Sequence, residues 1–189
     1  MSTVLYDPIK AMSMVTDSVI VAFSGGKESV VTLDLCSRYF KNIKSFFMYI
    51  VPDLSFQERT MEWYEKRYQI EIMRIPHMDV SEFYHYGSFR PGDPTFPIVS
   101  INDIYQYVRL ETDFWWIAAG ERIDDSIVRR AMMKKSGSID VQRGRFFRFR
   151  RGKRRRSWII SNSIISILDR TAENWGSLSA RYGARNYMR

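Results

Sequence analysis

Short apolar runs alternate with longer segments of helical composition along most of the chain. The apolar runs are rich in β-branched or aromatic residues and end at serine–glycine, proline or glycine, which predicts buried strands. They lie at residues 18–23, 45–51, 70–75 and 114–119. The longer segments predict helices at residues 30–40, 57–68, 101–110 and 124–135. Repeated strand–helix alternation predicts an α/β fold, with a Rossmann-like parallel sheet of about five strands covered by helices on both faces.

The stretch between the third apolar run and the helix at 101–110 has a mixed pattern. Residues 79–86 predict one or two helical turns. Residues 87–97 contain several glycines and prolines and predict a loop. Ser100 is the expected N-cap of the helix that follows.

Composition favours one globular domain. The chain has 189 residues, of which 45% are hydrophobic and 15% aromatic, enough for a single compact core. No apolar run approaches the roughly 20 residues that span a bilayer, and the first residues lack the layout of a secretory signal. The single cysteine, Cys36, excludes an internal disulfide framework. We therefore expect a cytoplasmic protein with an α/β domain at residues 1–170 and a C-terminal tail at 171–189.

A glycine pair separates the first apolar run from the first helix. Gly25 and Gly26 allow a sharp turn and a close approach of ligand to backbone, and the N–H groups of a helix's first turn favour an anion. The candidate phosphate-binding residues are Ser24, Gly25, Gly26, Lys27, Glu28 and Ser29. The loop is too short for the Walker A pattern, which disfavours a P-loop NTPase. An ordinary glycine turn that caps a helix is the alternative.

Residues 19–29 resemble the PP-loop family, the adenine-nucleotide α-hydrolase-like proteins, whose motif S-G-G-K-[DE]-S follows the first strand. The resemblance implies that the loop binds the pyrophosphate part of ATP, with Mg²⁺, and that cleavage falls between the α and β phosphates. Most members have Asp where this chain has Glu28, a departure that bears on Mg²⁺ placement rather than on phosphate binding. The resemblance also places Asp53, after the second strand, near the adenosine; a simple turn residue is the alternative.

A second block, residues 120–129, is similar to the G-x-R-x-x-[DE]-S-x-x-R segment of the family's sulfonucleotide (PAPS) reductase-like branch. Two guanidiniums suit bidentate phosphate contact; a solvated helix start with acidic residues in its first turn is the alternative. The binding residues implied here are Gly120, Arg122, Asp125, Ser126 and Arg129. Ligands bind beyond the carboxyl ends of parallel strands, so we expect this block on the same rim of the sheet as Ser24.

The same resemblance implies ATP-dependent adenylation of a substrate oxygen with loss of pyrophosphate. Lys27 and Arg122 are then the expected catalytic residues, and the glycine loop would stabilise the departing pyrophosphate. Reductases of this branch use a cysteine near the C-terminus, but residues 171–189 contain none, and Cys36 is expected to pack in the core. Without cysteines near the two histidines, we expect neither a zinc site nor an iron–sulfur cluster.

The positive charge is concentrated in one segment. Residues 141–168 contain nine Lys or Arg and no acid, a local charge of +9; the whole chain carries +8, so the remainder sums to −1. A basic arm at residues 143–156 holds these cations and three phenylalanines, around a hairpin or flexible loop at Gly152. Its candidate nucleic-acid-binding residues are Arg143, Arg145, Arg148, Arg150, Arg151, Lys153, Arg154, Arg155 and Arg156.

The basic arm leaves several functions open. Cations neutralise phosphates and aromatics stack on bases, so nucleic acid is the leading partner; an acidic protein partner or no specific role are the alternatives. The phenylalanines could instead pack in the core. A membrane role is not expected. Besides an adenylating enzyme that acts on nucleic acid or a nucleotide, the chain could be a catalytically silent subunit of a nucleic-acid assembly. It could also be a sulfonucleotide enzyme that uses an external thiol.

Overall fold

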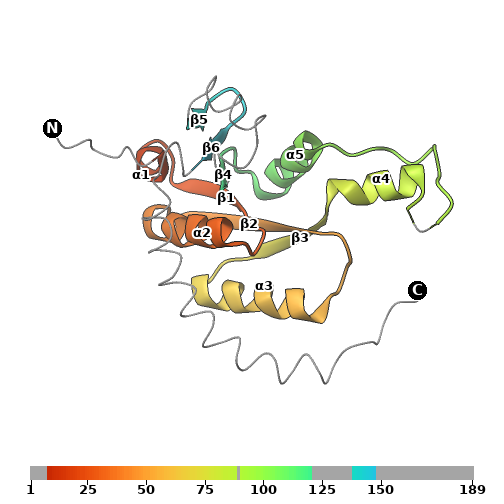
Figure 1. Cartoon of the computed structure of the whole chain (residues 1–189). Coiled ribbons are helices and arrows are strands. Elements are labelled where there is room, and N and C mark those ends of the chain that lie inside the picture. Colours follow the sequence, from red (N-terminus) through yellow and green to blue (C-terminus); the bar gives the residue numbers. More distant parts are fainter. Residues whose placement is uncertain (1–7, 89, 121–137, 148–189) are drawn as a thin grey trace.

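The computed structural model describes residues 8–88, 90–120 and 138–147 (Figure 1). The helices are α1 (Pro8–Ser13), α2 (Lys27–Tyr39), α3 (Ser55–Tyr68), α4 (Met78–Tyr86) and α5 (Ile101–Thr112). The strands are β1 (Ser18–Ala22), β2 (Asn42–Tyr49), β3 (Ile72–Pro76), β4 (Ile117–Ala119), β5 (Ile139–Asp140) and β6 (Arg145–Phe147). The predicted helix at 124–135 and a fifth strand that the family resemblance implies near 158–161 lie outside the described residues.

The strands form one sheet in the order β3-β2-β1-β4-β6-β5. Near its centre, β1 runs parallel to both neighbours, with Ile20 opposite Lys44 of β2 and Ile117 of β4. The β2–β3 and β4–β6 pairs are also parallel, and only β5 is antiparallel to its partner β6. The predicted α/β class with a Rossmann-like parallel sheet is therefore confirmed.

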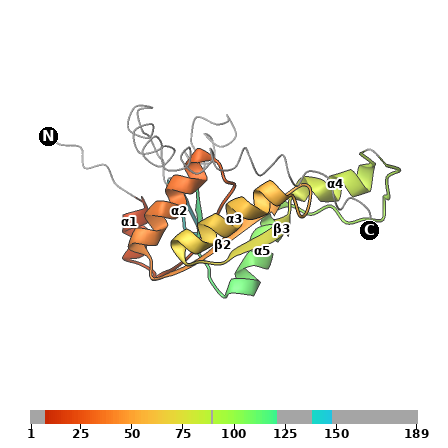
Figure 2. The ribbon, with the colours of Figure 1, turned by 90° about the horizontal axis from the view of Figure 1, so that it is seen from below.

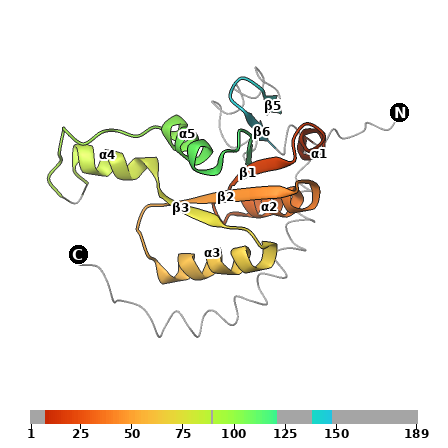
Figure 3. The ribbon, with the colours of Figure 1, turned by 180° about the vertical axis from the view of Figure 1, so that it is seen from behind.

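Helices cover both faces of the sheet, because the side chains of β1 alternate between two cores. Val19 and Val21 pack on the face covered by α1, α2 and α3, whereas Ile20 packs with α5 on the other. All three side chains are fully buried. Figures 1 and 3 show α2 and α3 on one side of the sheet and α5 on the other. Figure 2 shows α2 and α3 lying next to each other. The central strand is thus fixed from both faces.

α5 begins where its sequence predicts. The side chain of Ser100 accepts a hydrogen bond from the backbone N–H of Asp103, and the Asp103 carboxylate accepts one from the backbone N–H of Ser100. This reciprocal capping box satisfies two donors at the helix start. The N-cap prediction for Ser100 is confirmed.

The fourth predicted strand is shorter than its apolar run, because Trp115 contacts α5, although the Trp116 carbonyl still accepts the backbone N–H of Ile20 in β1 at 2.8 Å. The Trp115 carbonyl accepts a hydrogen bond from Arg109 Nε at 2.9 Å, and the Arg109 guanidinium lies 4.3 Å from the centre of the Trp115 ring. Arg109 also donates to the Arg143 carbonyl at 2.6 Å. The prediction of a strand beginning at residue 114 is wrong for this reason.

The start of the basic arm belongs to the sheet. Phe146 of β6 pairs with Ala118 of β4, and the side chains of Phe146 and Phe147 are 0% and 1% exposed. Two of the three phenylalanines of the arm therefore pack in the core rather than lie ready for bases. The expected turn at Gly152 lies outside the described residues.

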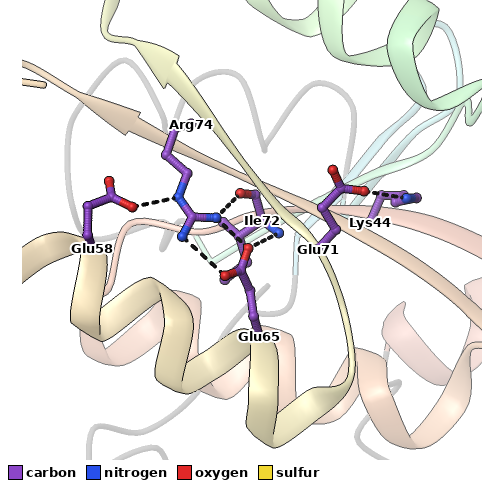
Figure 4. A network of polar contacts seen from close by, with 6 residues as sticks. All are labelled: Lys44, Glu58, Glu65, Glu71, Ile72 and Arg74. Atoms are coloured by element: carbon purple, nitrogen blue, oxygen red, sulfur yellow. Dashed lines mark hydrogen bonds and ion pairs between the residues drawn. The ribbon is translucent and has the colours of Figure 1, made fainter. Parts of the chain in front are cut away.

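Ion pairs around Arg74 tie the edge strand β3 to α3 (Figure 4). Arg74 Nε lies 3.1 Å from Glu58 Oε2, and the guanidinium also pairs with Glu65. Glu65 Oε1 accepts the backbone N–H of Ile72 at 2.9 Å, and Arg74 donates to the Ile72 carbonyl. Burial raises the pKa of Glu65, but the hydrogen bonds from Arg74 and Ile72 and the charge of Arg74 outweigh it and hold the pKa below its usual value. Side chains thus occupy both backbone groups of Ile72 at the sheet edge.

Replacement of Phe146 by Ala should lower the free energy of unfolding by about 3–5 kcal/mol, because it leaves a cavity in a closed core. Urea denaturation followed by circular dichroism measures this. Phe56 on α3 is 55% exposed and serves as the matched control, for which Phe56→Ala should cost within about 0.5 kcal/mol. Equal losses for the two variants would contradict the placement of Phe146 in the core.

Candidate functional site

The turn between β1 and α2 presents its backbone to solvent. Gly25 has φ +72°, a left-handed conformation that favours glycine, and a Cβ added there would meet no atom within 4 Å. Gly26 is the N-cap of α2, and no side chain among the described residues makes a capping hydrogen bond at this helix start. Residues 24–27 are exposed. An open helix start beside a glycine turn favours an anion, since first-turn N–H groups and the helix dipole both attract negative charge.

The two serines of the loop lie in different environments. Ser24 is exposed, whereas Ser29 is only 5% exposed. Ser29 Oγ donates to the Gly26 carbonyl at 2.9 Å and accepts from the backbone N–H and the hydroxyl of Ser24, both at 3.2 Å. A sequence signal for this burial exists: Ser29 shares the helical stripe of Leu33 and Cys36, which are both fully buried. The sequence motif alone treats the two serines alike.

Gly120, the first residue of the second sequence block, packs against the loop. It follows β4, and a Cβ added there would lie 2.8 Å from the Glu28 carbonyl carbon and 2.9 Å from the Ser29 nitrogen. Only glycine allows so close an approach of two backbones. The strand order changes direction between β1 and β4, the place where α/β sheets bind ligands. Gly120, the first residue of the second block, thus lies on the predicted rim beside the loop.

The remaining residues of that block, which carry its guanidiniums and its carboxylate, lie outside the described residues. They are Arg122, Asp125, Ser126 and Arg129. Their phosphate-binding role stays a prediction.

Two more polar residues follow strands at this edge of the sheet. Asp53, after β2, has φ +55°, a conformation that Asp tolerates better than most residues. His77, after β3, is the N-cap of α4, and its Nδ1 accepts the backbone N–H of Asp79 at 3.2 Å. Local turn and cap geometry explains both residues without a ligand. The position of Asp53 near an adenosine remains a prediction.

Cys36 packs inside the protein. Its side chain is 0% exposed and belongs to the core between the sheet and the first three helices. The prediction that this cysteine packs is confirmed. Within residues 8–88, 90–120 and 138–147, no three His, Cys, Asp or Glu side chains are grouped so that they could hold a metal ion.

Two cations of the basic arm are engaged within the fold. Arg143 pairs with the buried carboxylate of Asp140 at 3.0 Å, and the Arg145 guanidinium lies 5.3 Å from the centre of the Tyr105 ring. The seven other cations, at residues 148–156, lie outside the described residues. Of the helices that the structure describes, none has the length and apolar character needed to cross a bilayer.

Comparison with known proteins gives a family match over most of the chain. The model of the phosphoadenosine phosphosulfate reductase domain matches residues 18–134, which include both sequence blocks. No curated protein matches the sequence.

Two solved structures of low sequence identity are similar to this chain to different degrees. One is the U34-tRNA thiolase NcsA from Methanococcus maripaludis with its [4Fe-4S] cluster, at 16% identity and a TM-score of 0.53. The alignment covers 82% of this chain and 62% of that chain, so this protein spans less than two thirds of NcsA. Another is a predicted subunit of tRNA methyltransferase from Methanocaldococcus jannaschii, at 14% identity and a TM-score of 0.40, covering 77% of this chain and 74% of that one.

The NcsA structure corrects one sequence-based expectation. The sequence predicts no iron–sulfur cluster, because no cysteine lies near His77 or His85 and such clusters are held mainly by cysteine thiolates. NcsA has the same fold and carries a [4Fe-4S] cluster. The expectation of no cluster is therefore wrong: a count of cysteines in one chain is no guide to cluster chemistry on this fold.

Replacement of Gly120 by Ala should destabilise the protein by about 1–3 kcal/mol, because the new methyl group would press on the backbone at Glu28 and Ser29. Gly26→Ala is the control, since its Cβ would meet only the Ser24 hydroxyl, at an ordinary 3.4 Å. Urea denaturation compares the two variants. A Gly120→Ala protein as stable as the wild type would show that the two backbones are not in contact.

Proposed function

Because the chain belongs to the phosphoadenosine phosphosulfate reductase domain family, we propose that it binds ATP, or a close analogue, with the phosphates on the loop at residues 24–29. We further propose that the protein adenylates a substrate oxygen and releases pyrophosphate. One observation carries it: an exposed glycine turn and an open helix start lie where the strand order changes direction. That is where an α/β sheet places a nucleotide.

The residues of the loop suit a polyphosphate. The open space beside Gly25 admits a ligand to the backbone, and the exposed Lys27 supplies a cation. Mg²⁺ usually reaches such sites with one or two carboxylates and the substrate's own phosphates, so it needs no cage of protein ligands. Bound there, the ion would neutralise phosphate charge. Lys27 and the N–H groups of the loop would hold the pyrophosphate portion.

The proposed reaction needs stabilisation of a leaving group. A substrate oxygen attacks the α-phosphorus of ATP, the bond to the bridging oxygen breaks, and pyrophosphate leaves with the bonding electrons. Positive charge on Lys27 and Arg122 would stabilise the charge that develops on pyrophosphate. Arg129 would add a second guanidinium on the phosphates. The contact of Gly120 with the loop supports this arrangement, since it anchors the start of the block that carries both arginines.

We propose nucleic acid as the substrate class, on the strength of the seven cations at residues 148–156. NcsA, which shares the fold, is a tRNA thiolase. The alternative of a sulfonucleotide enzyme needs an external thiol, because Cys36 is fully buried. The alternative of a silent binding subunit differs in one observable, the turnover of ATP.

Pyrophosphate release separates the adenylating function from the silent binding subunit. The purified full chain is incubated with ATP and Mg²⁺, with and without a mixed tRNA pool, and pyrophosphate is measured by a coupled enzyme assay. The adenylating function predicts release that rises when tRNA is added. ATP binding without release in either condition would favour the silent subunit, and no ATP binding at all would remove the nucleotide function.

Replacement of Lys27 by Ala should weaken ATP binding roughly 10- to 100-fold, because a charged hydrogen bond contributes about 1.5–3 kcal/mol. Isothermal titration calorimetry measures the affinity. Lys41→Ala is the matched control. Lys41 is an exposed lysine that pairs with Asp17 at 2.8 Å, and both residues directly precede their strands, at the end of β1 away from the loop. Similar affinities for the Lys27 and Lys41 variants would place the phosphates elsewhere.

The basic arm should bind nucleic acid chiefly through phosphates. If about five cations each neutralise a phosphate, log affinity falls against log salt with a slope of roughly −3.5 for single strands and −4.5 for duplex. Joint replacement of Arg154, Arg155 and Arg156 by Ala should flatten that slope and leave ATP affinity unchanged. Fluorescence anisotropy across a salt series measures it. A slope near zero in the intact protein would instead favour an acidic protein partner.

A further inference from the structure

We infer that Ser29 is a positioning residue, whose hydroxyl holds the phosphate loop in its binding shape through Ser24 and Gly26 and does not itself contact phosphate. The inference rests on the nucleotide binding proposed for this loop and assigns a role that the sequence motif does not distinguish. Burial separates Ser29 from the rest of the loop: residues 24–27 are exposed, whereas Ser29 is 5% exposed.

The hydrogen-bonding capacity of the Ser29 hydroxyl is fully used inside the loop. A serine hydroxyl offers one donor and two acceptor lone pairs. The Ser29 donor serves the Gly26 carbonyl at 2.9 Å. Its two acceptor sites serve the backbone N–H and the hydroxyl of Ser24, each at 3.2 Å. A phosphate that bound this hydroxyl would have to break one of these bonds.

The same bonds span the glycine turn. They join Ser24, the last residue before the turn, to the first turn of α2, and Gly26 N–H adds a contact to Ser24 Oγ at 3.4 Å. The turn itself passes through Gly25, which has φ +72° and no side chain to support it. The Ser29 hydroxyl thus braces the loop, in the sense that its hydrogen bonds connect Ser24 and Gly26 across the glycine turn.

Gly120 packs against the backbone of Ser29. Its Cα packs on the Glu28–Ser29 peptide so closely that a Cβ would lie 2.9 Å from the Ser29 nitrogen. The Ser29 backbone is therefore backed by the end of β4, while its side chain points to Ser24. A loop held in this way is ordered before a ligand arrives, which lowers the entropy lost on binding.

The test uses Ser29→Ala in the full chain, with Ser37→Ala as the matched control. Ser37 lies on the same helix, and its hydroxyl makes the same kind of bond, to the carbonyl of Asp34 three residues earlier, at 2.8 Å. Two quantities are measured: amide hydrogen exchange of Ser24 by NMR in the protein without nucleotide, and ATP affinity by calorimetry.

We expect Ser29→Ala to speed exchange at the Ser24 amide about tenfold and to weaken ATP binding about tenfold, the factors that correspond to roughly one net hydrogen bond. Ser37→Ala should change neither quantity. Unchanged exchange at Ser24, or faster exchange with unchanged ATP affinity, would overturn the inference. A wild-type protein that binds no ATP would refute the proposed function, while the exchange measurement would still decide whether Ser29 braces the loop.

Discussion

The parallel pairing of β1 with β2 on one side and β4 on the other is the interaction on which the candidate site depends. β1 is buried on both faces, with Val19 and Val21 in one core and Ile20 in the other. A strand held in this way has one register available, since a shift by one residue would exchange its two faces. The end of β1 then fixes where the glycine turn begins, and the end of β4 delivers Gly120 onto the first turn of α2.

Sequence patterns predicted most of this arrangement because the strong local signals agree with one another. The apolar run at residues 18–23 predicts a strand, the glycine pair after it predicts a turn, and the apolar stripe that follows predicts the helix α2. The signal that predicted Ser100 as the N-cap of α5 was equally local. Where prediction failed, a distant partner decided: Trp115 lies in a run that looks like a strand, but its carbonyl and ring contact Arg109 of α5, which also donates to the Arg143 carbonyl before β6. For the phenylalanines of the basic arm, the sequence left packing in the core open, and the pairing of β6 with β4 places Phe146 there.

The sequence motif names the residues of the candidate loop but not the different environments that the fold gives them. The motif marks Ser24 to Ser29 as one unit, whereas the fold separates an exposed stretch from a buried serine that is bonded back to it. Whether a fold carries a metal cluster is harder to predict from the sequence than which residues form the loop. Cys36 packs in the core as predicted, yet NcsA carries a [4Fe-4S] cluster on the same fold, so the number of cysteines in one chain does not exclude a cluster.

The central claim is that phosphates bind at the exposed glycine turn, and a titration of the backbone amide NMR spectrum tests it most directly. With ATP and Mg²⁺, the amides of Gly25, Gly26 and Lys27 should shift strongly, because phosphate oxygens would accept hydrogen bonds at this turn. Adenosine, which lacks the phosphates, should leave these three amides almost unmoved. Equal shifts with adenosine, or ATP-dependent shifts confined to other parts of the chain, would contradict phosphate binding at this loop.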